Sequence, residues 1–460
     1  MKTFDHILFG TGQATGTLLA GLLPSGESIA VIEGHRIGGT CVNTGCTPTK
    51  TLVASARVAQ MARRAPEYGI HPGDPADLRV DFSEVMARMN KVRGDSTSGL
   101  EGWINSQEQI TMFRNWGRFE GPKQIRVGDE IISGKQIYIN TGARPRVPDI
   151  LGLDDVPWLD NERILDLTDL PEHLIILGGS YIGLEFGQIF RRLGSSVTVI
   201  ERGDQLVSHE DSDVAHAVKE ILEREGINIW LGAAAGQVST SEGGGIAVVV
   251  EDDEGSTVLN GSHLLVAVGR IPNSDRMGLD EAGIKANDRG YIVVDDYCRT
   301  NIDGVFALGD VNGHGAFTHT SVNDAEIVLD LMRGGTRRLS DRIPTYALFI
   351  DPALGRVGLT EREALNRGYK VLKATRQMAK ISRAKEMGET LGFAKLLVDA
   401  ETDLILGAAI LGAGGDEIIN MFTAYMYSGL PCHSYRRSVL IHPTISELMP
   451  WILDTLQPVN

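Results

Sequence analysis

The stretch that decides the fold is 4-FDHILFGTGQATGTLLAGLLPSGESIAVIEG-34, in which apolar runs alternate with glycine-rich turns. It predicts in order a strand, a glycine-rich turn, a helix and a second strand, at residues 4–10, 10–16, 17–23 and 28–34. The same order returns at 174-LIILGGSYIGLEFGQIFRRLGSSVTVIERG-203. Because one supersecondary unit is duplicated, we expect two nucleotide-binding domains of α/β type.

Both turns carry the glycines that a dinucleotide site needs. Backbone N–H groups of such a turn can approach a pyrophosphate, and the following helix N-terminus adds partial positive charge. The matching glycines are Gly10 and Gly12 in the first unit, and Gly178 and Gly183 in the second. The pattern is imperfect in both copies, since Thr15 holds the third glycine position of the first and Ser180 the middle position of the second.

An acidic residue follows each turn at the same distance. Glu33 and Glu201 each lie 23 residues after the first glycine of their unit, where a carboxylate can accept hydrogen bonds from ribose hydroxyls. Because Glu201 would repel a 2′-phosphate, we expect NADH to be favoured over NADPH. The neighbouring arginines Arg191, Arg192 and Arg202 weaken that expectation. The alternative is that the turns bind nothing, which two matched copies disfavour.

The segment 38-GGTCVNTGCTPTK-50 places Cys41 and Cys46 five residues apart, ahead of a predicted helix with Pro48 in its first turn. A helix N-terminus stabilises a thiolate and so raises its reactivity. Two inert structural cysteines are an alternative reading. Half of a zinc site is another, but Cys298 and Cys432, the remaining cysteines, do not have the spacing of a second ligand pair.

The composition narrows the classes of partner. Hydrophobic residues make up 42% and charged residues 23% of the 460, as in ordinary soluble enzymes. The net charge of −16 predicts a surface that repels nucleic-acid phosphates and anionic membranes. The sequence contains no apolar run of about 18 residues, so we expect no membrane-spanning helix. The hydrophobic core of a signal peptide is not found after the N-terminus. We therefore expect a cytoplasmic protein without nucleic-acid or membrane partners.

The rest of the chain predicts further helices and strands, and near residue 340 the pattern changes to that of another fold class. Residues 66–77 predict a Pro/Gly-rich loop, and residues 82–105 a helical stretch. Residues 264–273 predict the strand that closes the second unit, and residues 303–313 another apolar strand. From about residue 340 the pattern indicates an α+β domain with an antiparallel sheet.

The cysteine segment resembles the redox motif of the class I pyridine nucleotide–disulfide oxidoreductases, which include glutathione reductase, dihydrolipoamide dehydrogenase and mercuric reductase. The resemblance extends over essentially the whole chain through TGARP (141–145), GRIPN (269–273), FALGD (306–310) and HPTISE (442–447). It implies an α/β fold with two Rossmann-like domains, for FAD and NAD, and a C-terminal α+β dimerisation domain. The expected ranges are 1–150 and 273–338 for FAD, 151–272 for NAD(P), and 339–460 for dimerisation.

The resemblance also assigns the FAD site. Gly10, Gly12 and Glu33 match the positions that hold the ADP half of FAD, and Asp310 matches the acid that bonds the ribityl chain. Further positions that the resemblance assigns to cofactor binding are Gly142 of TGARP, Gly269 and Arg270 of GRIPN, and Gly178, Gly183 and Glu201 of the second unit.

Four more residues match positions around the reactive ring. Thr40 and Lys50 match residues beside the isoalloxazine, and Glu185 matches the partner of that lysine near flavin N5. Tyr181 matches an aromatic lid over the nicotinamide side. Without the resemblance, Lys50 reads as a surface lysine, Glu185 as a solvated helix residue and Tyr181 as part of a core.

The C-terminal motif supplies an acid–base pair by the same resemblance. His442 matches the group that exchanges a proton with the interchange thiol, and Glu447 matches the carboxylate that orients it. In the family this histidine comes from the other subunit, so the resemblance implies a homodimer. His433 reads as structural.

The implied reaction passes electrons from NADH through FAD to the Cys41–Cys46 disulfide. Cys46 is then the thiolate next to the flavin, and Cys41 is the interchange thiol that attacks a small disulfide substrate. The protein would thus be an enzyme acting on a sulfur group with NAD(P).

Two alternatives stay open. Reduction of mercury or another metal ion is favoured by the amino-acid sequence of the cysteine motif, which resembles that of mercuric reductases. It is disfavoured by His442, where mercuric reductases have a tyrosine, and by an end, LDTLQPVN, that lacks their cysteine pair. A non-catalytic flavoprotein that senses redox state or assembles a complex is the other alternative, which the intact Cys41, Cys46 and His442 disfavour.

Overall fold

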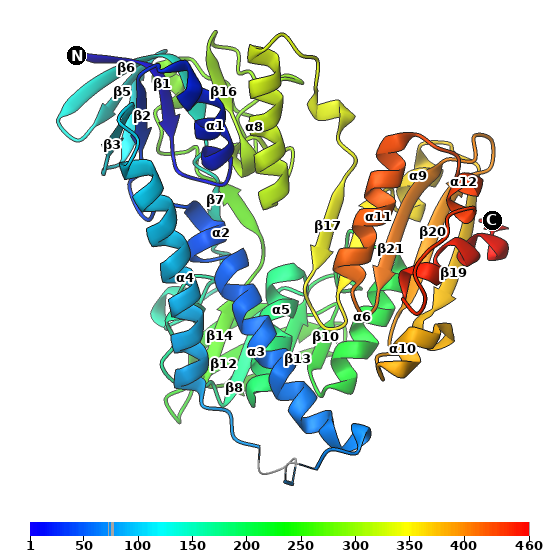
Figure 1. Cartoon of the computed structure of the whole chain (residues 1–460). Coiled ribbons are helices and arrows are strands. Elements are labelled where there is room, and N and C mark those ends of the chain that lie inside the picture. The colour runs from blue at the N-terminus through cyan, green and yellow to red at the C-terminus, as the bar shows by residue number, and fades with distance from the viewer. Residues whose placement is uncertain (72, 75–77, 460) are drawn as a thin grey trace.

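Figure 1 shows the computed structural model of the chain, which describes residues 1–71, 73–74 and 78–459. The elements form three lobes, which we call the N-terminal, second and C-terminal lobes. Helices α3 (Cys46–Arg64) and α4 (Phe82–Asn105) run from the N-terminal lobe along the second lobe. The predicted loop at 66–77 starts in a short 3₁₀ turn, η2 (Ala65–Tyr68), and its residues 72 and 75–77 lie outside the described residues.

The N-terminal lobe is built on a seven-stranded sheet of order β3-β2-β1-β6-β5-β4, with β16 beside β6. Its strands are β1 (Lys2–Phe9), β2 (Ile29–Ile32), β3 (Ile110–Phe113), β4 (Gly117–Gly121), β5 (Gln124–Val127), β6 (Glu130–Ile139) and β16 (Val305–Ala307). The central strands are parallel and buried on both faces. Helices α1 (Ala14–Leu22) and α8 (Thr318–Met332) pack together over one of these faces (Figure 1).

The first helix begins earlier than the sequence predicts. Helix α1 starts at Ala14, not at residue 17, because the Thr15 amide already donates to the Gly12 carbonyl at 3.0 Å. The departure at Thr15 is accommodated by hydrogen bonds, since its buried hydroxyl donates to the Gly10 carbonyl and accepts from the Asn140 amide. A threonine therefore closes the turn at the third glycine position.

The second lobe repeats the unit, as the duplication predicts. Its parallel sheet has the order β10-β9-β8-β14. The elements are β8 (His173–Leu177), α5 (Tyr181–Leu193), β9 (Ser196–Glu201), α6 (Ser212–Arg224), β10 (Asn228–Leu231) and β14 (His263–Val266), with an antiparallel sheet of β11 (Ala234–Thr240), β12 (Ile246–Asp252) and β13 (Gly255–Gly261).

The predicted closing strand over residues 264–273 is two strands. β14 ends at Val266, and β15 (Arg270–Pro272) pairs instead with β7 (Ala143–Pro145). Gly269, at φ +118°, turns the chain between them, a conformation that glycine adopts without strain. The TGARP and GRIPN motifs thus form a two-stranded link between the lobes. The short helix α7 (Leu279–Ala282) follows in the chain and contacts β4 of the N-terminal sheet.

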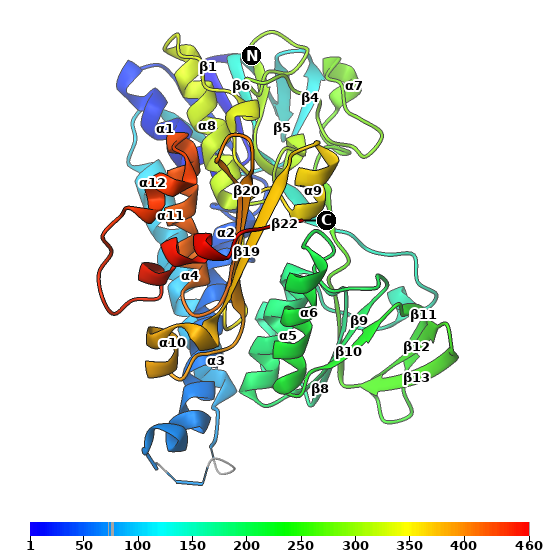
Figure 2. The same cartoon turned by 90° about the vertical axis from the view of Figure 1, so that its right-hand side faces the viewer.

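The C-terminal lobe contains the predicted antiparallel sheet, of order β17-β18-β21-β20-β19-β22. Its strands are β17 (Thr345–Leu348), β18 (Leu354–Gly358), β19 (Val371–Gln377), β20 (Phe393–Asp399), β21 (Ile405–Leu411) and β22 (Gln457–Pro458), and its helices are α9 (Glu361–Asn366), α10 (Ser382–Glu386), α11 (Gly415–Ser428) and α12 (Cys432–Arg436). Helices α11 and α12 cover one face of the sheet, while the other face meets α5 and α6 of the second lobe (Figure 2).

Across the described residues, no helix is both long and apolar enough to cross a membrane. The boundaries that divide the chain at 150, 272 and 338 stay predictions.

Candidate active site

A short helix, α2 (Gly39–Asn43), and the start of the long helix α3 carry the cysteine pair to the first glycine-rich turn. Cys41 lies in α2, and Cys46 is the first residue of α3, not a residue ahead of it. A Cβ on Gly39 would lie 3.0 Å from the Gly12 Cα, so only glycine allows the two segments to approach this closely. The sulfurs therefore lie beside the turn of the first nucleotide site.

The two sulfurs differ in their electrostatics. Both cysteines are free thiols in this structure, and the Cys41 thiol donates a hydrogen bond to the Cys46 sulfur. That bond, assisted by the Thr318 hydroxyl at 3.4 Å and the positive charge of Lys50, lowers the pKa of Cys46 to about 6. The same bond, together with burial, raises the pKa of Cys41. Cys46 is thus the thiolate of the pair, and it stands at a helix N-terminus, which favours negative charge.

Thr318 is a site residue that the sequence does not single out. It opens α8, and 272 residues separate it from Cys46 in the chain. The nearest signal is the FALGD motif at 306–310, which precedes it and turns the chain toward the site. A contact over this separation is visible only in the folded chain.

Lys50 and Glu185 form the pair that the resemblance implies. The Lys50 Nζ donates to the Glu185 Oε2 at 2.6 Å, and the Glu185 side chain is only 7% exposed. The other carboxylate oxygen of Glu185 accepts from the Phe349 amide at 3.0 Å, and the Lys50 Nζ lies 4.4 Å from the centre of the Phe349 ring. Three lobes therefore meet at this pair, and neither side chain fits the alternative of an isolated surface residue.

The first turn has the form of a cradle for a pyrophosphate and its ribose. Gly10 has φ +97°, and a Cβ there would lie 2.5 Å from the Asn140 carbonyl oxygen. Glu33, at the end of β2, accepts from the Thr11 amide at 3.0 Å and the Thr11 hydroxyl at 2.6 Å, which holds its carboxylate against the turn. The glycine backbone, the N-terminus of α1 and the fixed carboxylate are the groups that the ADP half of FAD requires.

A second charged pair lies near the cysteines. Arg270 Nε is 3.8 Å from Asp310 Oδ2, and Arg270 also donates to the Thr40 hydroxyl at 3.4 Å and to the Ala143 carbonyl. Burial raises the pKa of Asp310 and lowers the pKa of Arg270. This half-buried carboxylate, in a long ion pair with Arg270, fits a polar hydroxyl chain such as ribityl. Gly142, at φ +67°, precedes Ala143, and a Cβ there would meet no atom within 4 Å, so this backbone faces open space.

The second turn repeats the cradle. A Cβ on Gly178 would lie 2.5 Å from the Ala267 carbonyl, and one on Gly183 would lie 2.1 Å from the Gly178 carbonyl. The Glu201 carboxylate accepts from the backbone amides of Gly179 and Gly203, each at 2.7 Å, and so lies at the turn.

Two of the three arginines that could change the preference for a nucleotide are engaged elsewhere, while Arg202, next to Glu201, is exposed. Arg191 donates to the Glu225 and Ser195 carbonyls, and buried Arg192 pairs with the side chains of Glu225 and Asp351. Neither guanidinium is thus directed at Glu201.

Tyr181 is the first residue of α5 and lies in a cluster of rings. Its ring is perpendicular to those of Phe317 and Tyr346, at 5.9 and 5.7 Å between centroids. Burial raises its pKa, so the phenol is neutral. Phe317 directly precedes Thr318, which places this cluster beside the Cys46 sulfur.

His442 and Glu447 form the expected contact on the surface of the C-terminal lobe. The His442 Nδ1 lies 3.0 Å from both carboxylate oxygens of Glu447, and the histidine side chain is 76% exposed. α12, which precedes this segment, lies well apart from α2 (Figure 1). The oriented imidazole therefore points to solvent rather than to the cysteines of its own chain.

The remaining cysteines are buried thiols. Burial raises the pKa of Cys298, and burial with the neighbouring Asp403 raises the pKa of Cys432 to about 12. The Cys432 thiol donates to Asp403 at 2.8 Å, and His433 bonds the same carboxylate. Within residues 1–71, 73–74 and 78–459 no group of three or more potential ligands could hold a metal ion.

Comparison with known proteins agrees with this geometry. Residues 4–325 match the family model described as pyridine nucleotide-disulphide oxidoreductase, and residues 344–453 match the dimerisation domain of that family. A probable pyridine nucleotide-disulfide oxidoreductase, RclA of Escherichia coli, is 35% identical over 457 residues, covering 97% of this chain and 98% of its own. A dihydrolipoyl dehydrogenase of Cupriavidus necator is 31% identical, covering 97% of each chain. A solved Cu(II) complex of the HOCl-induced flavoprotein disulfide reductase RclA from Escherichia coli superposes with a TM-score of 0.88 at 34% identity, covering 99% of both chains.

Proposed function

The chain belongs to the pyridine nucleotide-disulphide oxidoreductases and is an FAD-dependent NAD(P)H:disulfide oxidoreductase, and we propose that Cys41 and Cys46 are its redox pair. The observation that carries this proposal is the position of the pair: Cys46 opens α3 with its sulfur 3.4 Å from the Thr318 hydroxyl, and α2, which holds Cys41, packs against the first glycine-rich turn. The pKa of Cys46 is lowered to about 6 at the N-terminus of α3, while the pKa of its neighbour Cys41 is raised. One stable thiolate next to one exchangeable thiol is the arrangement that disulfide chemistry needs.

The residues around the first turn support FAD as the cofactor at this site. Gly10, Gly12 and Glu33 would hold its ADP half, and Asp310 its ribityl chain. Thr40 and the Lys50–Glu185 pair would lie beside its ring. When bound, FAD accepts hydride from a reduced nicotinamide and passes an electron pair to the cysteine disulfide.

The thiols then reduce a small disulfide in two exchanges. The Cys41 sulfur, after losing its proton to a base, attacks one sulfur of the substrate and forms a mixed disulfide, releasing the first product thiolate. The Cys46 thiolate attacks the Cys41 sulfur, which closes the Cys41–Cys46 disulfide and releases the second thiolate. The partner subunit's His442, oriented by Glu447, takes the Cys41 proton and returns it to a departing thiolate.

This role for His442 requires a homodimer. The exposed position of the imidazole and the match to a dimerisation domain both support one. Within 15 residues of His442 in the chain, the C-terminal lobe exposes five large apolar side chains, namely Tyr427, Leu430, Val439, Ile441 and Trp451. Their burial by a second copy would stabilise the dimer and bring His442 to the neighbouring cysteine pair.

The second turn supports NADH as the reductant. Glu201 lies where it can accept from a free ribose 2′-hydroxyl, and it would repel a 2′-phosphate. Arg191 and Arg192 are held by other partners and do not offset this repulsion.

Metal-ion reduction is a second candidate. It is favoured by the solved Cu(II) complex of RclA, and the Cys41–Cys46 pair offers two sulfur ligands suited to a soft metal ion. Cys432 does not take part, since its thiol is buried and bonded to Asp403.

A panel of acceptors tests the two candidates. The purified holoenzyme is supplied with NADH or NADPH and with lipoamide, glutathione disulfide, cystine, Cu(II) or Hg(II), and nucleotide oxidation is followed. We expect turnover with a disulfide and a higher kcat/KM for NADH. Turnover with metal ions alone would favour the second candidate, and turnover with neither class would support a non-catalytic flavoprotein.

A further inference from the structure

The ring of Tyr181 rests against a parallel stack of three other rings. His319 stacks on Phe317 at 5.4 Å between centroids and 10° between planes, and Phe317 stacks on Tyr346 at 5.8 Å and 11°. Tyr181 stands nearly perpendicular to the last two, at 90° and 82°. Edge-to-face contacts of this kind add about 0.5–1.5 kcal/mol each beyond area burial, so the stack gives Tyr181 a defined resting position.

Tyr346, at one end of this stack, is hydrogen-bonded to a buried carboxylate. The Tyr346 hydroxyl donates to the Glu210 Oε1 at 2.7 Å, and the Glu210 side chain is fully buried. The second oxygen of Glu210 lies 3.4 Å from the Nη1 of Arg356, which is itself buried. A hydrogen bond to a buried carboxylate is stronger than one to a neutral acceptor, and its loss removes the donor to the Glu210 Oε1 while Arg356 still faces the other oxygen.

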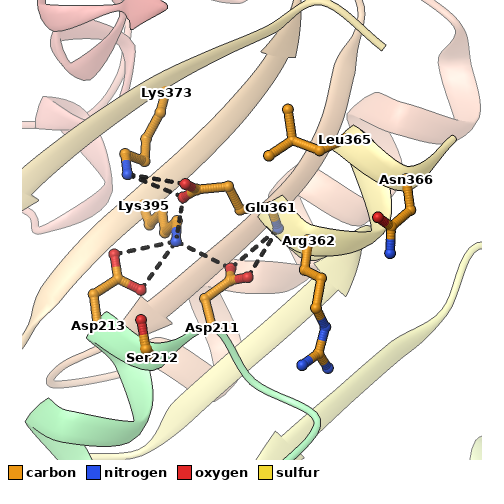
Figure 3. A pocket seen from close by; sticks show the side chains of 9 residues that line it. All are labelled: Asp211, Ser212, Asp213, Glu361, Arg362, Leu365, Asn366, Lys373 and Lys395. Carbon is orange, nitrogen blue, oxygen red and sulfur yellow. Dashed lines mark hydrogen bonds and ion pairs between the residues drawn. The ribbon is translucent and has the colours of Figure 1, made fainter. Parts of the chain in front are cut away.

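The anchor belongs to a larger ionic cluster between two lobes. Four residues form a row across neighbouring strands of the C-terminal sheet. In order, they are Tyr346 (β17), Arg356 (β18), Ala409 (β21) and Lys395 (β20). This row faces the start of α6 in the second lobe. Figure 3 shows its far end, where the Lys395 ammonium donates to Asp211 and Asp213 and pairs with Glu361.

We propose that Tyr346 is a positioning residue which, anchored by Glu210, holds the Tyr181 ring closed over the nicotinamide side of the flavin site. This inference rests on the proposed function and on the role of a lid over the nicotinamide side, which the resemblance to the family implies for Tyr181. The C-terminal lobe thereby sets the free energy needed to move the lid when a nucleotide enters. A nucleotide that carries nicotinamide must displace Tyr181, whereas ADP-ribose, which lacks the nicotinamide ring, binds without displacing it.

Calorimetric binding of NAD+ and ADP-ribose to the oxidised holoenzyme tests the proposal without turnover. Tyr346→Phe keeps the ring stack and removes the anchor. We expect the Kd for NAD+ to fall about 2- to 10-fold, the equivalent of one hydrogen bond of about 0.5–1.5 kcal/mol, while the Kd for ADP-ribose stays unchanged. Glu210→Gln keeps an acceptor for the hydroxyl and removes the charge, so it should shift NAD+ binding in the same direction by less.

Tyr138→Phe is the matched control. It removes a buried tyrosine hydroxyl that bonds His6 and Met332, at the end of α8 opposite Thr318, and should leave both Kd values unchanged. Tyr181→Ser removes the lid itself and should lower the Kd for NAD+ at least as far as Tyr346→Phe.

Equal NAD+ affinity in wild type and Tyr346→Phe, together with tighter NAD+ binding by Tyr181→Ser, would overturn the proposal. Tyr181 would then still act as a lid, but Tyr346 would not hold it in place. Equal affinity in all three proteins would overturn the lid and the proposal together. A parallel change for ADP-ribose would mean that Tyr346 acts on the whole nucleotide site, which also contradicts the proposal.

Discussion

At the scale of single residues, the reactivity of the site follows from three groups around one sulfur. Cys46 accepts hydrogen bonds from the Cys41 thiol and the Thr318 hydroxyl, and the charge of Lys50 adds to both. Each of them favours the thiolate over the thiol. The bond to Cys46, burial and the charge of Cys46 disfavour ionisation of Cys41. In the proposed mechanism its proton therefore leaves through an outside base, the partner subunit's His442.

The first prediction concerns the pH dependence of this thiolate. The pKa of Cys46 is lowered from its ordinary value to about 6, so the thiolate is present above about pH 6 and is lost as the pH falls below it. In the two-electron-reduced holoenzyme, the long-wavelength absorbance of a thiolate against oxidised flavin should fade with a midpoint near pH 6. Thr318→Val removes one donor to the thiolate and should move that midpoint upward, which a spectrophotometric titration measures.

Thr318→Ser retains the hydroxyl and serves as the control, with an unchanged midpoint. An unmoved midpoint in Thr318→Val would show that the hydroxyl at 3.4 Å does not stabilise the thiolate.

At this scale the sequence predicts which residues are reactive better than it predicts which residues contact one another. Cys41 and Cys46 are marked by their spacing and their glycine-rich surroundings, because a local motif encodes a local turn. Lys50 and Glu185 are 135 residues apart, and only the resemblance to a known family pairs them before the structure does. Thr318 escapes both approaches, since no local pattern distinguishes a threonine that a distant helix will meet.

At the scale of elements, periodicity predicts the helices and strands that local patterns encode, but not the pairings between segments that are distant in the chain. The two strand–turn–helix–strand units are predictable because apolar alternation and glycine turns are local. The division of residues 264–273 into β14 and β15 is not, because the partner of β15 is β7, more than a hundred residues earlier. The position of the C-terminal sheet against α5 and α6 likewise depends on buried ionic contacts that sequence spacing does not show.

The second prediction concerns these ionic contacts. Lys395 is 1% exposed, and its ammonium holds Asp211, Asp213 and Glu361 together. Lys395→Met should lower the free energy of unfolding by about 1–3 kcal/mol, because it removes the cation that the three carboxylates share. Asp211 keeps Arg356 and Glu361 keeps Lys373, which limits the loss. Denaturant unfolding of the holoenzyme measures the change.

Lys370→Met is the matched control, because Lys370 pairs with Glu401 and both side chains are exposed. Exposed pairs contribute about 0–1 kcal/mol, so this variant should unfold much like the wild type. Equal stability of the two variants would contradict the structural role given to the ionic cluster.

At the scale of the whole molecule, the proposed mechanism makes the site of one chain incomplete. The cysteines, the two nucleotide turns and the Lys50–Glu185 pair meet where the lobes join, but the acid–base pair of His442 and Glu447 lies on the outer surface. Val439 and Ile441, beside His442, are 99% and 80% exposed. A second copy of the chain would cover these apolar side chains and supply the missing proton carrier.

The third prediction follows from that arrangement. In a dimer that combines a Cys41→Ser chain with a His442→Ala chain, one site has both cysteines from one chain and His442 from the other. Co-expressed and separately tagged, such hybrid dimers should regain about half of the wild-type disulfide reductase activity, whereas both parent homodimers are nearly inactive.

If His442 served the cysteines of its own chain, each site of the hybrid would lack one group, and the hybrid would be as inactive as its parents. Sedimentation of the hybrid confirms that the two chains are associated during the assay.

The most direct test of the account is an anaerobic titration of the holoenzyme with NADH, in wild type and in a Cys41→Ser/Cys46→Ser variant. We predict that the wild type takes up two electrons into the cysteine pair before its flavin is bleached, with a long-wavelength band from the Cys46 thiolate, while the double variant bleaches at once and has no disulfide turnover. A protein that binds no flavin, or a double variant that retains the band and full turnover, would contradict the account.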